Sequence, residues 1–146
     1  MKLVSKSVKE TRLFAKKFAK EILKMPNLMV LSLEGEIGVG KTTFTQGFAE
    51  ALGIKEKVQS PTFVILKIYD IPKSRKNLIH VDAYRLQAKD FKALGWRGFI
   101  NPPAGRPQNI ILVEWGNKIK NILPKNTTRI IFKHSQTPNE RIVFIQ

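Results

Sequence analysis

Residues 35–42 read Gly35-Glu36-Ile37-Gly38-Val39-Gly40-Lys41-Thr42 and fit the spacing G-x-x-x-x-G-K-[ST]. Before them, the apolar run from Leu28 to Leu33 predicts a short buried strand. After them, a helix is expected from about Lys41 to Leu52, and Gly53 ends it because glycine takes the left-handed conformation at little cost. A strand, a glycine-rich turn and a helix in this order are typical of loops that hold phosphate groups. They predict an α/β fold of the P-loop NTPase type.

The residue types of this loop indicate its chemistry. Glycines let backbone N–H groups turn toward a phosphate, and the positive end of the following helix dipole reinforces that cradle. Lys41 is expected to reach the β and γ phosphates, and the hydroxyl of Thr42 is expected to bind Mg²⁺. The residues predicted to contact the nucleotide here are Ile37, Gly38, Val39, Gly40, Lys41, Thr42 and Thr43.

Length and composition narrow the class of protein. A chain of 146 residues with 42% hydrophobic residues is expected to form one domain, residues 1–146. No apolar stretch approaches the roughly 20 residues of a membrane span, and the first six residues lack the apolar run of a signal peptide, so a cytoplasmic location is expected. The absence of cysteine excludes disulfides, thiolate zinc sites and cysteine nucleophiles.

The chain is strongly basic, with 26 Lys and Arg against 11 Asp and Glu and a formal charge of +15. A field of this sign attracts polyanions and acidic protein surfaces. Lysines are spread over the whole length, however, and compositional bias or simple solvation of the surface would give the same pattern. Both interpretations remain open.

The remaining elements are predicted from periodicity and turn residues. Ser7 and Glu10 form a capping box ahead of a helix with apolar residues at helical spacing up to Leu23. Strands Thr62 to Tyr69 and Leu78 to Asp82 are separated by only eight residues, too few for a parallel crossover, so they should pair as an antiparallel hairpin.

The second half of the chain predicts a mixed, mainly parallel sheet flanked by helices, with antiparallel hairpins. Its expected elements are a short helix at Ala88 to Leu94, an exposed loop at 101–108, a strand at Asn109 to Val113, a helix at Asn117 to Leu123 and a closing hairpin formed by Thr128 to Lys133 and Arg141 to Ile145.

Two acids end apolar strands: Asp82 follows Leu78 to Val81, and Glu114 follows Ile110 to Val113. Ligands of open α/β sheets bind beyond the carboxyl ends of the parallel strands, so both acids are expected to face the phosphates. A surface charge at a strand end is the alternative for each.

The predicted hairpin also brings Thr62 to the sheet edge that carries Asp82. In Ser60-Pro61-Thr62, the Thr62 hydroxyl could sense Mg²⁺ or the γ-phosphate, and a plain turn before a strand is the alternative. His80 and His134 fit packing or solvent positions better than metal ligation, because neither has metal-ligand spacing. No Asn/Thr-Lys-x-Asp segment that would read guanine is present, so ATP is favoured over GTP.

Several segments together resemble the TsaE family, also called YjeE. These are residues 35–43, Ser60-Pro61-Thr62, His80-x-Asp82-x-Tyr84-Arg85 and Val113-Glu114-Trp115. The resemblance implies a bacterial ATPase that acts with TsaB and TsaD to form N6-threonylcarbamoyladenosine at position 37 of tRNAs reading codons that begin with A. It also implies that tRNA is reached through that complex.

The resemblance implies roles for individual residues. Thr42 and Glu114 would be the Mg²⁺ ligands, while Asp82, with Lys41, would be catalytic and would act through water on the metal or on hydrolysis. The residues alone do not rank Asp82 above Glu114. Trp115 fits core packing better than a partner surface. The basic, proline-rich stretch after Leu94 departs from the family pattern and bears on partner contacts.

Two other functions remain open from the residues. A small-molecule or nucleoside kinase would usually carry an arginine-rich lid, and seven scattered arginines offer little support for one. A nucleic-acid-binding ATPase would interleave exposed aromatics with basic residues, whereas the nine phenylalanines mostly occupy apolar core spacings.

Overall fold

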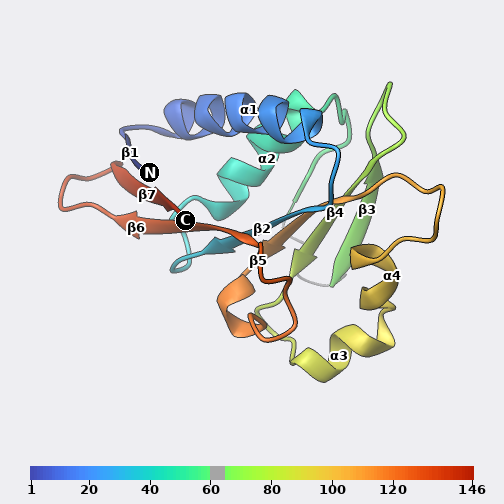
Figure 1. Ribbon diagram of the computed structural model, residues 1–146. Helices are drawn as coiled ribbons and strands as arrows, with labels where there is room; N and C mark the ends of the chain where they lie inside the picture. The colour runs from blue at the N-terminus through green and yellow to red at the C-terminus, as the bar shows by residue number, and fades with distance from the viewer. Residues whose placement is uncertain (60–64) are drawn as a thin grey trace.

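A seven-stranded mixed sheet runs through the computed structural model, which describes residues 1–59 and 65–146 (Figure 1). The strand order is β1-β7-β6-β2-β5-β4-β3. The four central strands, β6, β2, β5 and β4, are parallel, and the hairpins β6–β7 and β3–β4 are antiparallel. Both predicted hairpins are confirmed. The strands are β1 (Lys2–Ser5), β2 (Met29–Glu34), β3 (Leu66–Asp70), β4 (Asn77–Asp82), β5 (Ile110–Glu114), β6 (Thr128–His134) and β7 (Arg141–Ile145).

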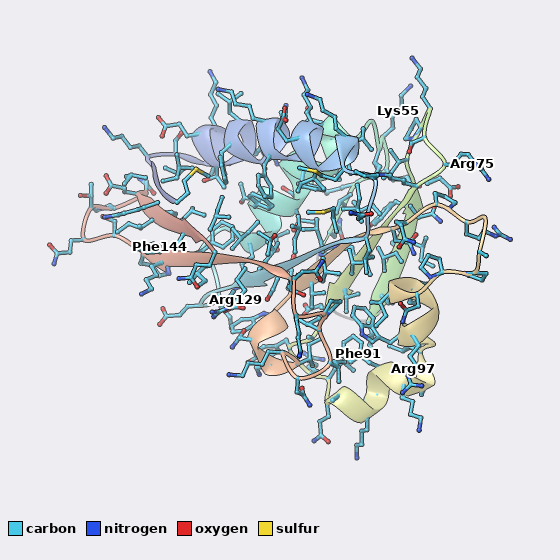
Figure 2. The ribbon with its side chains drawn as sticks, viewed as in Figure 1. Lys55, Arg75, Phe91, Arg97, Arg129 and Phe144 are labelled. Carbon is cyan, nitrogen blue, oxygen red and sulfur yellow. The ribbon has the colours of Figure 1, made fainter. Side chains whose placement is uncertain are left out.

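Helices cover both faces of the sheet. Figure 1 shows α1 (Val8–Lys24) and α2 (Lys41–Ala51) together on one face, and α3 (Ala88–Ala93) and α4 (Trp96–Ile100) on the other. The central strand β5 is buried along its whole length, and its residues alternate between two cores. Ile110 and Leu112 join the core under α1 and α2, whereas Ile111 and Val113 join the core that contains Phe91 of α3 (Figure 2).

The ends of the two long helices follow from their capping residues. The Ser7 hydroxyl accepts a hydrogen bond from the Glu10 backbone N–H at 3.1 Å, which confirms the predicted N-cap of α1. The Glu10 carboxylate accepts from the backbone N–H of Lys6 at 2.7 Å, one residue before the cap. At its C-terminal end, α2 is followed by Gly53 at φ 85°, as predicted.

The structure differs from the expected elements in short segments. The helix predicted for residues 117–123 is only one 3-10 turn, η1 (Gly116–Lys118), and Gly116 lies so close to β2 that a Cβ there would be 2.1 Å from the Ser32 hydroxyl oxygen. The strand β1 and the helix α4 were not predicted, since four or five residues carry too little periodicity. Residues 62–64 of the predicted strand lie outside the described residues. No helix in the described ranges has the length and apolar character to cross a membrane.

Candidate functional site

The glycine-rich loop, residues 35–40, connects β2 to α2 at the carboxyl edge of the parallel strands. Gly35 takes φ 143°, and a Cβ there would lie 2.5 Å from the backbone oxygen of Phe132, so a side chain has no room. Gly40 caps α2 at φ 111°. Because β2, β5 and β4 are parallel and adjacent, their carboxyl ends meet beside this loop.

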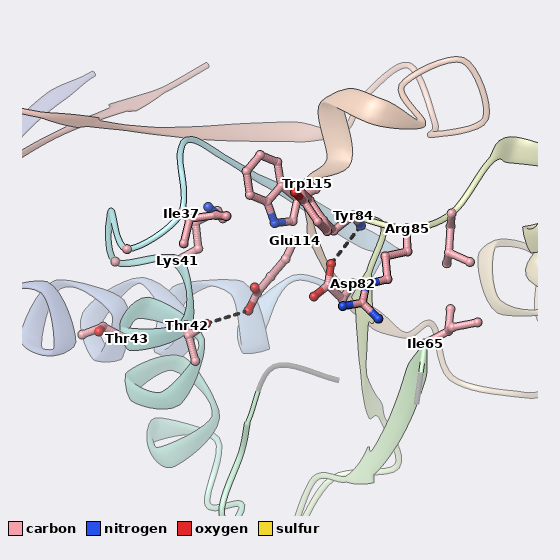
Figure 3. A pocket seen from close by; sticks show the side chains of 13 residues that line it. Ile37, Lys41, Thr42, Thr43, Ile65, Asp82, Tyr84, Arg85, Glu114 and Trp115 are labelled. Atoms are coloured by element: carbon pink, nitrogen blue, oxygen red, sulfur yellow. Dashed lines mark hydrogen bonds between the residues drawn. The ribbon is translucent and has the colours of Figure 1, made fainter. Parts of the chain in front are cut away.

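A cavity of about 650 Å³ opens at this edge (Figure 3). Asp82 and Glu114 occupy paired positions on β4 and β5. The predicted site residues that line the cavity are Ile37, Gly38, Gly40, Lys41, Thr42, Thr43, Asp82 and Glu114. Val39 is separate: its side chain is 1% exposed, is buried in the core under α1, and borders a smaller hollow of about 310 Å³ instead. Thr62 lies outside the described residues.

Lys41 is held inside the loop. Its Nζ atom donates hydrogen bonds to the backbone oxygens of Gly35 at 2.6 Å and Glu36 at 2.7 Å, and it lies 4.1 Å from the centroid of the Trp115 ring. Burial lowers the pKa of Lys41, and the charges of Glu114 and Asp82 act in the opposite direction. Two backbone carbonyls thus hold the Lys41 side chain within the glycine-rich loop.

Glu114 links α2 to the neighbouring strand. The Thr42 hydroxyl donates to Oε1 of Glu114 across 3.4 Å, and Nε2 of His80 lies 3.1 Å from the same oxygen. Glu114 is 3% exposed and His80 is 0% exposed, so this contact is shielded from water. Sequence reasoning placed His80 in packing and missed this contact. Its position two residues before Asp82 puts both side chains on one face of β4, but the contact with Glu114 also depends on the pairing of β4 with β5.

Asp82 is partly exposed and shapes the turn after β4. Its Oδ1 accepts a hydrogen bond from the backbone N–H of Tyr84 at 2.9 Å, and the next residue, Ala83, donates its N–H to the backbone oxygen of Glu114 at 2.9 Å. These two hydrogen bonds fix the position of Asp82 relative to Glu114. Arg85, three residues further on, also lines the cavity.

Aromatic side chains form one wall of the cavity. Trp115 has a left-handed backbone at φ 61° and donates its N–H to the Leu33 oxygen at 2.9 Å. Its ring packs partly on the core that contains Phe91 of α3. The centroid of the ring lies 4.9 Å from that of the Tyr84 ring. Lys118 Nζ lies 4.3 Å from the Tyr84 ring centroid. Trp115 therefore combines the predicted core packing with a cation–π contact to Lys41.

The fold and the site define an α/β protein that carries a phosphate-loop sequence at the carboxyl edge of a sheet with a parallel centre. The chain belongs to the TsaE family: the family described as "Threonylcarbamoyl adenosine biosynthesis protein TsaE" matches residues 5–143. This family takes part in tRNA threonylcarbamoyladenosine biosynthesis. The resemblance predicted from the sequence is confirmed.

Individual relatives agree with this assignment. The chain is 40% identical to the tRNA threonylcarbamoyladenosine biosynthesis protein TsaE of Bacillus subtilis, over 79% of this chain and 68% of that protein. It is 33% identical to the protein of the same name from Treponema pallidum, over 77% of this chain and 78% of that protein. The crystal structure of Bacillus subtilis YdiB superimposes with a TM-score of 0.76 at 33% identity, covering 98% of this chain and 82% of that one. The predicted α/β fold is confirmed as well.

Proposed function

We propose that this protein is a Mg²⁺-dependent ATPase that supports threonylcarbamoyladenosine formation on tRNA together with TsaB-like and TsaD-like partners. One observation carries the proposal. Lys41 and Thr42 from the glycine-rich loop and the carboxylates Asp82 and Glu114 from two neighbouring strands line a single cavity. Cationic, hydroxyl and carboxylate groups in this arrangement are the parts that phosphoryl transfer requires.

The glycine-rich loop would hold the phosphates. Backbone N–H groups at the start of α2 and the helix dipole favour an anion there. Lys41 already donates to two backbone carbonyls, and charged phosphate oxygens are better acceptors than carbonyls. The lysine would therefore exchange these partners for the β and γ phosphates.

The oxygen atoms near the loop fit a magnesium ion. Neighbouring ligands of octahedral Mg²⁺ lie about 2.9 Å apart, which follows from Mg–O distances of about 2.0–2.1 Å. Thr42 Oγ1 and Glu114 Oε1 are 3.4 Å apart, so a small inward shift brings both onto one ion. No cluster of three or more His, Cys, Asp or Glu side chains suited to a metal occurs in the described parts of the chain, so water and phosphate oxygens would complete the shell. When bound, the ion neutralises phosphate charge.

Asp82 would act beside these ligands. It stands opposite Glu114 in the register of β4 and β5, and it is more exposed than Glu114. An acid in this place can order a water on the metal or orient the water that attacks the phosphate. ATP, rather than GTP, remains the predicted nucleotide.

The test is ATP binding by the variant Lys41→Ala, measured by calorimetry with Mg²⁺. Loss of charge-assisted hydrogen bonds of roughly 1.5–3 kcal/mol should weaken binding by about 10- to 150-fold. Lys125→Ala removes an exposed lysine away from the cavity and should bind ATP like the unmodified protein. Unchanged affinity in Lys41→Ala would rule out the phosphate role of the loop.

A further inference from the structure

His80 does not line the cavity, but it lies within hydrogen-bond distance of Glu114, the predicted metal ligand. The ring is fully buried, at 0% exposure, and its Nε2 atom lies 3.1 Å from Oε1 of Glu114. The same oxygen receives the Thr42 hydroxyl at 3.4 Å. A buried imidazole and a loop hydroxyl therefore meet at one carboxylate oxygen.

The sheet itself builds this contact. In the parallel register of β4 and β5, His80 lies opposite Leu112 and Asp82 lies opposite Glu114. Alternate residues of a strand point to the same face, so His80 and Glu114 share the face covered by α2. Glu114 reaches back along β5 to the ring. Because both residues belong to central strands, the contact does not depend on a loop conformation.

The hydrogen bonds of the ring indicate its tautomer. Nδ1 of His80 is buried and has no hydrogen-bond partner among the described residues. An imidazole with its proton on Nε2 donates to Glu114 and leaves the bare nitrogen at Nδ1, which agrees with this environment. The opposite tautomer would place two acceptors against each other at 3.1 Å.

We propose that His80 is a positioning residue for Glu114: its Nε2–H fixes the carboxylate in the orientation in which Oε1 and the Thr42 hydroxyl meet at one magnesium ion. This inference rests on the magnesium site of the proposed function. A glutamate side chain has several rotatable bonds, and a carboxylate that is not held loses this freedom each time a cation binds. Partners that orient metal ligands typically change metal affinity by about 10- to 100-fold.

Two variants separate the hydrogen bond from the volume of the ring. His80→Leu fills most of the space but removes the donor, while His80→Gln keeps an N–H donor at a similar distance from the backbone. The control is Leu78→Val, which perturbs packing on the same strand and the same face two residues earlier, at a side chain that has no donor for Glu114. Thermal unfolding of all variants reports their folding.

The measurement is binding of a fluorescent methylanthraniloyl derivative of a non-hydrolysable ATP analogue, titrated with MgCl₂ and repeated in EDTA. His80→Leu should raise the MgCl₂ concentration at half-maximal binding by about 10- to 100-fold, with affinity in EDTA unchanged. His80→Gln should shift it less, and Leu78→Val should not shift it. The inference is overturned if His80→Leu keeps the midpoint of the unmodified protein, if it loses affinity equally in EDTA, or if the Gln and Leu variants are equally impaired.

If the magnesium site of the proposed function is wrong, the titration gives a different result. If the unmodified protein binds the analogue equally well with MgCl₂ and with EDTA, the magnesium site itself is wrong, and the role of His80 is wrong with it. A nucleotide-free readout adds an independent check. The chain has two histidines, and His134 is exposed, so a long-range ¹H–¹⁵N spectrum assigned with His80→Gln should show the proton of His80 on Nε2. A proton on Nδ1 alone would contradict the inference.

Discussion

At the scale of single residues, Asp82 combines a backbone contact with a charge at the cavity. Its Oδ1 accepts the Tyr84 N–H at 2.9 Å, which stabilises the turn after β4. Its charge is the part that would act on a water molecule near the phosphates. A substitution to alanine removes both, whereas a substitution to asparagine keeps a carbonyl oxygen for the turn and removes only the charge.

Asp82→Asn should therefore bind ATP like the unmodified protein but hydrolyse it more slowly. The expected loss of turnover is roughly 100-fold or more, the usual contribution of a positioned acid or base. Phosphate release under saturating ATP measures turnover, and calorimetry measures binding. Asp82→Ala should additionally lower the unfolding temperature. Hydrolysis at the unmodified rate by both Asp82→Ala and Glu114→Ala would refute the assignment of the acids.

At the scale of elements, a charged contact joins β2 to β6 just before the glycine-rich loop. Arg129 of β6 donates to the Glu34 carboxylate with Nη2 at 2.7 Å and Nε at 3.0 Å, and the Ser32 hydroxyl donates at 2.9 Å. Burial raises the pKa of Glu34, but the hydrogen bonds from Arg129 and Ser32 outweigh it and hold this pKa below its ordinary value.

This depressed pKa predicts a pH-dependent stability. The stabilisation is fully present above the ordinary value of 4.5 and is lost as the pH falls through the lower pKa of the folded state. At pH 7, Glu34→Gln should lower the free energy of unfolding by about 1–2 kcal/mol, the modest end for a charged hydrogen bond because Arg129 is half exposed. The difference should shrink as the pH falls below 4.5. Urea unfolding between pH 3 and pH 7 tests it, and a difference constant with pH would contradict it.

Helices α1 and α2 approach each other closely at Gly47. A Cβ at Gly47 would lie 2.8 Å from the backbone oxygen of Arg12 and 2.9 Å from its Cα, and backbone atoms cannot turn away. Alanine gains up to about 1 kcal/mol in a helix over glycine, but overpacking costs about 1–3 kcal/mol. Gly47→Ala should therefore destabilise the protein. Gly98→Ala in α4 should stabilise it slightly, because among the described residues no atom beyond the adjacent residues and the backbone of α4 lies within 4 Å of the new Cβ. Urea unfolding of both variants should give opposite signs.

At the scale of the whole molecule, the sequence predicted the elements and residues with a local signal. The strand, loop and helix around Lys41 and the acids at strand ends are local patterns, and they predict most of the candidate site. The spacing of the loop does not predict where each side chain lies: the side chain of Val39 fills the core under α1, and its contact with the nucleotide stays a prediction. The His80 contact depends on strand order and register, which no local pattern contains.

The molecule as a whole carries a large positive charge. The formal charge is +15, and Figure 2 shows Lys55 and Arg75 projecting at the top of the view and Arg97 projecting near its lower end. A distributed positive field speeds encounter with an acidic protein surface or with tRNA, and salt screens it over about 10 Å at 0.1 M. Association with such partners should therefore weaken as the salt concentration rises.

We expect the isolated protein to hydrolyse ATP slowly and a partner to raise its turnover. Fast hydrolysis at phosphate loops needs an arginine on the transferred phosphoryl group, worth roughly 10³- to 10⁵-fold in rate. Arg85 is the one arginine among the described residues lining the cavity, and Figure 3 shows it on the Asp82 side, away from Lys41. A partner could supply or orient the missing charge.

Phosphate release should be measured for the protein alone, with TsaB and TsaD, and with tRNA added, at low and high salt. We expect stimulation by the partners and a smaller stimulation at high salt when the partners are limiting, because screening slows encounter without changing the cavity. The variant Arg85→Ala tests whether the charge on the phosphoryl group comes from Arg85 of this chain or from a partner. A large loss of the basal rate would assign the arginine to this chain, whereas loss only of the stimulated rate would mean that partners bring Arg85 into place. Fast hydrolysis by the protein alone, unaffected by any partner, would refute partner control and favour a kinase instead.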